Sequence, residues 1–77
     1  MDTLTADDII RRRTELGLSV ARLAREAGVN PATIWRWETG KTTPSGLALR
    51  QLAATFKRLE ANQARRAARR ASAGAVD

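Results

Sequence analysis

The side chains best suited to specific chemistry lie close together, within residues 30–43. This stretch holds the Arg36 guanidinium, the Asn30 amide, the Trp35 indole and several hydroxyl groups. A guanidinium presents N–H donors in a planar fork, which matches the two acceptors on the edge of a guanine or the oxygens of a phosphate. The segment therefore favours recognition of another molecule through hydrogen bonds and apolar contact.

The composition argues against catalysis. The 77-residue chain contains no Cys and no His, so it lacks thiolate ligands, disulfides and the commonest acid–base group. A chain of this length forms a single hydrophobic core, and we expect no separate effector domain. We also expect no catalytic residue, no cofactor, no metal and no small-molecule ligand.

The net charge of +6 is unevenly placed. Arg65, Arg66, Arg69 and Arg70 lie near the C-terminus, where Asp77 is the single acid, so this segment carries half of the excess. Such an excess suits nucleic acid before a membrane, although a solvated charged face would give the same count. No apolar run approaches the ~20 residues of a transmembrane helix, and the start of the chain lacks the basic and apolar regions of a signal peptide. The expected location is cytoplasmic.

Capping residues and apolar periodicity predict the helices that position these side chains. The expected helices span residues 6–16, 20–27, 31–39 and 46–64. Thr5 and Ser19 are placed to cap the first two, and a glycine follows each. Asn30 caps the third, where Pro31 has a preset φ and no amide to leave unsatisfied. Ser45 is placed to cap the fourth.

The apolar stripe of the fourth helix ends at Leu59. Ala is the only apolar residue type in residues 61–73, so helix propensity stays high while burial is poor. We expect helix through about residue 64 and a disordered end from Ser72. The predicted fold is all-α: a compact bundle of four to five helices in residues 1–64, with a basic and partly disordered helical extension over residues 65–77.

The third helix has two distinct faces. Ile34 and Trp37 are three residues apart and define the buried face. Trp35 lies roughly 100° from Ile34 and roughly 200° from Trp37, so it should be exposed together with Arg36. For Trp35, packing at a subunit contact competes with apolar contact to a thymine methyl or a sugar.

Two short helices joined by a glycine-containing turn are typical of a DNA-binding helix-turn-helix. The run LGLSVARLAREAGVNPATIWRWETGKTTPS closely resembles the Cro/C1 (XRE) class of helix-turn-helix repressors. The resemblance covers residues 9–59. It is carried by a small residue in the second helix, a turn glycine, core positions and a Glu-x-Gly-Lys ending: Ala24, Gly28, Val29, Ile34, Trp37, Glu38, Gly40 and Lys41.

The resemblance implies that the third helix enters the major groove of double-stranded DNA. The residues expected to contact bases are Asn30, Pro31, Ala32, Trp35, Arg36 and Thr39. The residues expected to contact phosphates are Ser19, Arg22, Thr33, Lys41, Thr42 and Thr43. Arg22 would serve equally well as a solvated side chain, and part of the role of Asn30 is its cap. At the start of the second helix, where the family usually has a Gln that contacts phosphate, this chain has Val20. The family also has an acidic residue in the third helix that pairs with an arginine of the first, so Glu38 is expected to form a structural ion pair with Arg13.

The resemblance further implies a sequence-specific transcriptional regulator, most simply a repressor that occupies an operator in a bacterial cell or a phage-infected host. One recognition helix contacts few base pairs, so we expect a homodimer, at least on DNA, with half-sites ~34 Å apart. An antitoxin or adaptor whose tail binds a protein, and RNA binding through the tail, are the alternatives. The tail itself fits a solvated helical extension, an additional arm that binds phosphates or the minor groove, or a dimerisation element.

Overall fold

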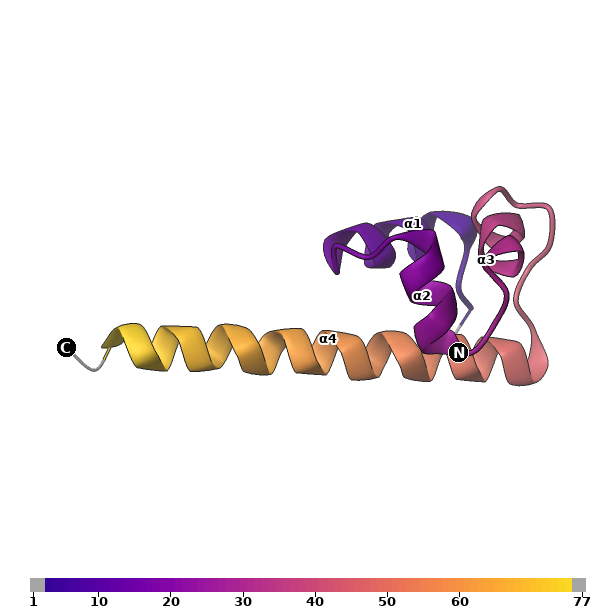
Figure 1. Ribbon diagram of the computed structural model, residues 1–77. Helices are drawn as coiled ribbons and strands as arrows, with labels where there is room; N and C mark the ends of the chain where they lie inside the picture. Colours follow the sequence, from indigo (N-terminus) through magenta and orange to yellow (C-terminus); the bar gives the residue numbers. More distant parts are fainter. Residues whose placement is uncertain (1–2, 76–77) are drawn as a thin grey trace.

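The computed structural model describes residues 3–75, and every regular element in that part of the chain is a helix. The helices are α1 (Ala6–Glu15), α2 (Val20–Ala27), α3 (Pro31–Glu38) and α4 (Gly46–Ala75). Helices α1 to α3 pack on the N-terminal half of α4, and the remainder of α4 projects past them (Figure 1). The predicted all-α fold class is confirmed, and the fourth helix and its predicted helical extension form one continuous helix.

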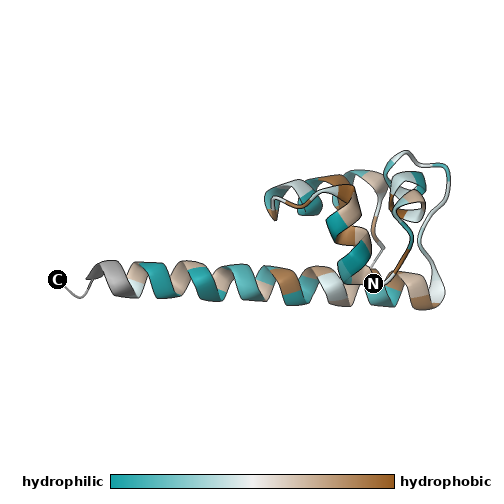
Figure 2. Ribbon diagram, viewed as in Figure 1, coloured by the Kyte–Doolittle hydropathy of each residue, from teal (hydrophilic) through white to brown (hydrophobic). Residues whose placement is uncertain are grey.

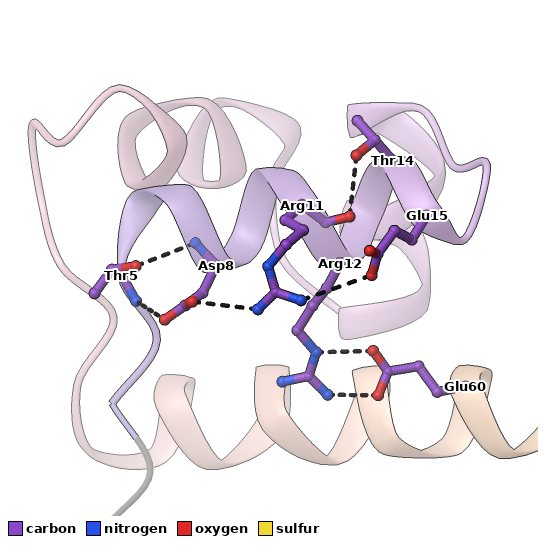
Figure 3. Close-up of polar contacts among 7 residues, drawn as sticks. All are labelled: Thr5, Asp8, Arg11, Arg12, Thr14, Glu15 and Glu60. Carbon is purple, nitrogen blue, oxygen red and sulfur yellow. Dashed lines mark hydrogen bonds and ion pairs between the residues drawn. The ribbon is translucent and has the colours of Figure 1, made fainter.

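Local hydrogen bonds start the first three helices where the sequence predicts. The Thr5 hydroxyl accepts from the amide of Asp8 at 3.1 Å, and the Asp8 carboxylate accepts from the amide of Thr5 at 3.0 Å (Figure 3). The hydrogen bond from the Thr5 amide contributes most to lowering the pKa of the Asp8 carboxylate, and the side chains of Thr5 and Arg11 lower it further. Ser19 and Asn30 cap α2 and α3, each accepting from an amide in the first turn.

The helix ends also depend on local geometry. Leu16 and Thr39 are the C-caps of α1 and α3, so each helix ends one residue earlier than predicted. Gly28, which follows α2, has a φ of 72°. A residue with a Cβ is disfavoured in this left-handed conformation, which explains the glycine in the turn between α2 and α3.

The core lies between α1, α2 and α3 and the first half of α4. Five large side chains are fully buried, one from each of the first three helices and two from α4: Ile9, Leu23, Ile34, Leu52 and Phe56. Ala24 is also fully buried, and its small side chain lets α2 pack closely against α3. The strongly hydrophobic residues of α4 therefore belong to the half beneath the other helices (Figure 2).

Ion pairs fix α4 against its neighbours. Arg12 of α1 donates from Nε and Nη2 to the two carboxylate oxygens of Glu60, at 2.8 and 2.6 Å (Figure 3). The Arg12 guanidinium also lies 4.6 Å from the centroid of the Phe56 ring. Arg58 donates to the carboxylate of Glu26 in α2 at 3.2 Å. The direction in which α4 leaves the globular part is therefore held by contacts to two different helices.

The C-terminal end of α4 differs from the prediction. The sequence predicts weakening helix after about residue 64 and disorder from Ser72, but α4 continues through Ala75. Residues 76–77 lie outside the described part. Residues 64–71 are all Ala or Arg, which are strong helix formers, and they extend a helix already nucleated by its packed first half.

The start of α4 also differs. Within residues 3–72 the Ser45 hydroxyl accepts no hydrogen bond from a backbone amide, so the expected side-chain cap is absent there. Instead the Ser45 carbonyl accepts from the amide of Leu49 at 3.3 Å, and Gly46 has a positive φ of 54°.

None of the helices within residues 3–75 combines the length and the hydropathy that spanning a bilayer requires.

Candidate nucleic-acid interface

Helix α3 separates its side chains into a buried and an exposed face. Ile34 and Trp37 are 0% and 5% exposed, whereas Trp35 is 51% exposed and Arg36 is also exposed. Contacts with α1 and α2 hold the buried face. The helix therefore presents a cation and a large aromatic ring to solvent from a rigidly packed element.

Arg36 lies in the last turn of α3, where the following loop folds back. Its carbonyl accepts from the amides of Lys41 at 2.9 Å and Thr42 at 3.4 Å. Within residues 3–72, no carboxylate forms an ion pair with the Arg36 guanidinium. Its side-chain donors therefore have no described acidic partner that a ligand would need to displace.

Lys41 lies over the ring of Trp35. Its ammonium nitrogen is 5.2 Å from the ring centroid, within the range of a cation–π contact. At an exposed site such a contact is worth about 0.5–1 kcal/mol, enough to favour one orientation of the indole. The sequence places Lys41 among the phosphate contacts and gives no sign of this pairing, because six residues and a helix end separate the two side chains.

The remaining predicted base contacts lie at the two ends of α3. Asn30, Pro31 and Ala32 are exposed at the N-terminus of the helix. The Asn30 side-chain oxygen is used in the cap, so its NH₂ group is the part suited to a ligand. Thr39 is exposed but donates its hydroxyl to the carbonyl of Trp35 at 2.9 Å, which leaves that oxygen as an acceptor.

The predicted phosphate contacts lie at two places: on α3 with the loop that follows it, and at the start of α2. Lys41, Thr42 and Thr43 form an exposed loop directly after α3, while Thr33 is partly buried in α3 itself. Ser19 is exposed, and its hydroxyl accepts from the amide of Arg22 at 3.0 Å as the cap of α2.

Arg22 lies in a different environment from the loop residues. Its Nε donates to Glu26 at 3.2 Å, and its side chain lines a shallow pocket between α2 and α4 that Arg66 also lines. Hydrogen bonds from Arg58 first, and then from Arg22, lower the pKa of Glu26. Through Glu26, which also accepts from Arg58, Arg22 is linked to α4.

Arg13 and Glu38 join α1 to α3. The Arg13 guanidinium donates to both Glu38 oxygens, at 2.6 and 3.1 Å, and to the carbonyl of Leu18 at 2.9 Å. The two side chains are 17% and 9% exposed, so the pair is largely removed from water. This geometry suits a structural role for Glu38, beside but separate from the exposed face of α3.

Two ion pairs that hold α4 against α1 and α2 were not predicted from the sequence. Arg12 pairs with Glu60 and Arg58 with Glu26, across 48 and 32 residues of chain. No periodicity links residues so far apart, and no local signal would have indicated which acid each arginine contacts.

Comparison with protein families identifies the motif. A family model described as helix-turn-helix matches residues 9–60, more than half of the chain. A comparison with curated proteins finds no match. The matched segment contains the α2–α3 pair, the exposed face of α3 and the part of α4 that packs on them. The chain belongs to the Cro/C1-type (XRE) helix-turn-helix family of DNA-binding transcription regulators.

Proposed function

We propose that this protein represses transcription by occupying an operator, with α3 inserted in the major groove. The observation that carries the proposal is the exposed Arg36 guanidinium, which lies on a helix fixed by its opposite face and has no carboxylate partner within residues 3–72. A protein bound in this way blocks access of the polymerase to the promoter. Regulation then follows from the amount of protein or from competition for the site.

Arg36 supplies base discrimination. Two of its N–H groups donate to O6 and N7 of one guanine, a contact worth about 1–3 kcal/mol against a wrong base. Trp35, restrained by Lys41, lies beside it and offers an apolar surface to a thymine methyl or a sugar. Asn30, Pro31, Ala32 and Thr39 complete the base-contacting set.

Phosphate contacts set the register of the helix in the groove. Lys41, Thr42 and Thr43 follow α3 directly, and Thr33 lies on α3 itself. Ser19 and Arg22 contribute from the first turn of α2. Such contacts orient the protein without carrying sequence information.

A homodimer completes the proposal. One recognition helix contacts too few base pairs to select one site in a genome, whereas two copies on half-sites ~34 Å apart double the sequence information. We expect the dimer to assemble mainly on DNA. Its operator would then be a symmetric or nearly symmetric sequence.

Selection of bound duplexes from a random pool tests the proposal, because one motif reports base preference, symmetry and spacing. Arg36→Ala should weaken specific binding by about 1–3 kcal/mol and relax the preference at one base step. Arg50→Ala, which removes an exposed arginine from α4, is the matched control and should leave the motif unchanged. Uniform weakening by Arg36→Ala across all sequences would instead make Arg36 a phosphate contact.

A further inference from the structure

The projecting part of α4 carries an unusual charge distribution. We define the extension as residues 61–75 of α4. It contains four arginines, Arg65, Arg66, Arg69 and Arg70, and no acidic residue. All four are exposed, and none forms an ion pair within residues 3–72.

The four arginines lie on one side of the helix. At 100° per residue they fall within an arc of roughly 140°, and they rise along roughly 7.5 Å of helix axis. Ala64, Ala67, Ala68 and Ala71 occupy the opposite arc. We call the charged side the arginine face.

Contacts with α2 show which way the arginine face points. Arg58 precedes Arg65 by seven residues, so the two lie on nearly the same line along α4. Arg58 contacts Glu26 of α2, and Arg66 lines the shallow pocket that Arg22 of α2 also lines. The arginine face therefore continues the side of α4 that packs on the first helix of the helix-turn-helix.

The extension is also held in a defined direction. The double hydrogen bond between Arg12 and Glu60, and the hydrogen bond from Gln63 to the carbonyl of Glu15 at 3.4 Å, lie at its start. A continuous helix then carries the four charges away from the globular part (Figure 1). They are presented as a fixed row rather than on a flexible chain.

We propose that the arginine face binds backbone phosphates of the double-stranded DNA that flanks the half-site contacted by α3. This inference rests on the proposed function and extends it to a second, sequence-independent contact surface. Charge complementarity selects the partner: four guanidinium groups on one side suit a regular row of phosphates, and they would repel the same face of a second copy. Bound phosphates would also replace the contact that Val20 cannot make.

The salt dependence of binding provides the test. The slope of log K against log salt becomes shallower by about 0.9 for each phosphate that the protein no longer neutralises. Arg65→Gln with Arg69→Gln should reduce the slope and weaken binding to a duplex of about 40 base pairs, which provides flanks on both sides of a pair of half-sites about two turns long. The matched control, Arg50→Gln with Lys57→Gln, removes the same charge from exposed positions elsewhere on α4 and should leave the slope nearly unchanged.

Duplex length separates flanking contacts from general charge. On a duplex of about 20 base pairs, which holds both half-sites and almost no flank, the Arg65 and Arg69 variant should bind like the wild type. Equal slopes for both double variants on the long duplex, or a loss of binding to an RNA hairpin instead of the duplex, would overturn the inference. Far-ultraviolet circular dichroism should show unchanged helix content in both variants.

The same measurements distinguish this inference from the proposed function. A wild-type protein without preference between a selected and a scrambled duplex would contradict the proposed function. Clear preference, together with an unaltered salt slope in the Arg65 and Arg69 variant, would contradict only the role of the arginine face.

Discussion

The two halves of α4 are one continuous helix in opposite surroundings. Residues 46–60 bury Leu52 and Phe56 in the core, whereas almost every side chain of residues 61–72 is exposed. The first half is stabilised by tertiary packing. The second is stabilised by the helix propensity of Ala and Arg and by continuation from turns that are already formed.

The charges of the two halves differ in the same way. In the first half, Arg58 and Glu60 each pair with a residue of another helix. In the extension, the arginines have no acidic partner within residues 3–72. Charged residues that hold the fold and charged residues available to a ligand thus occupy successive turns of a single helix, and four predictions test that division.

The largest expected effect on stability comes from truncating a buried side chain in the first half of α4. Phe56→Ala should lower the free energy of unfolding by about 3–5 kcal/mol, because it removes a fully buried ring and leaves a cavity. Ala68→Gly in the extension should cost only about 1 kcal/mol of local helix stability and leave the unfolding of the globular part unchanged. Urea unfolding and circular dichroism measure both. A shared loss of global stability would show that the halves fold as one unit.

A second test concerns the buried charges behind α3. Glu38→Gln should cost about 3 kcal/mol, because it leaves the Arg13 guanidinium without its counter-charge in a site mostly closed to water. Arg13→Met combined with Glu38→Leu should recover much of that stability. By contrast, Arg66→Gln in the extension should change stability by less than about 0.5 kcal/mol. Chemical denaturation of all three variants provides the comparison.

The junction between the halves should respond to acid. Arg12 lowers the pKa of Glu60 through its hydrogen bonds, so this carboxylate stabilises the fold above the ordinary glutamate pKa of about 4.3. That contribution disappears as the pH falls through the lower pKa of the folded state. Glu60→Gln should therefore cost no more than about 1 kcal/mol at neutral pH and nothing in strong acid.

Unfolding measured over a series of pH values tests the junction. The curves of the wild type and of Glu60→Gln should converge as the pH decreases. Glu15→Gln removes one partner of an exposed ion pair and serves as the control, with little change at any pH. A constant gap between the wild type and Glu60→Gln would show that packing, and not charge, is what the substitution removes.

The smallest expected effect on stability comes from removing most of the extension. A chain shortened to residues 1–63 keeps the contact of Gln63 with α1 and should unfold within about 0.5 kcal/mol of the full chain. It should retain its preference for selected duplexes while its affinity and salt dependence decrease. Complete loss of sequence preference would move recognition from α3 to the extension.

Most of the helical part of this fold was predictable from local patterns. Thr5, Ser19 and Asn30 each cap the helix that follows, because a cap needs only a side chain and an amide two or three residues away. The faces of α3 follow from the helical repeat, which buries Trp37 and exposes Trp35. Helix α4 is longer than predicted, because the helix propensity of its Ala and Arg residues outweighs their poor burial.

The candidate site was predictable in part. The exposed side chains of α3 followed from spacing, and the pairing of Arg13 with Glu38 followed from the family resemblance. The surroundings of the predicted phosphate contacts did not follow: Arg22 lines one pocket with Arg66, and Lys41 lies over the ring of Trp35. Those placements depend on how α2 packs on α4 and on how the chain turns after Gly40.

The sequence by itself determined where helices begin, which face of each is apolar and which family the chain resembles, because these properties depend on residues within a few turns of one another. Tertiary structure alone decided that Arg12 of α1 pairs with Glu60 of α4, whereas the resemblance already indicated the partner of the neighbouring Arg13. Tertiary structure also decided that the arginine face continues the side of α4 that meets α2. Long-range pairing is set by the packing of whole helices, and spacing along the chain does not encode it.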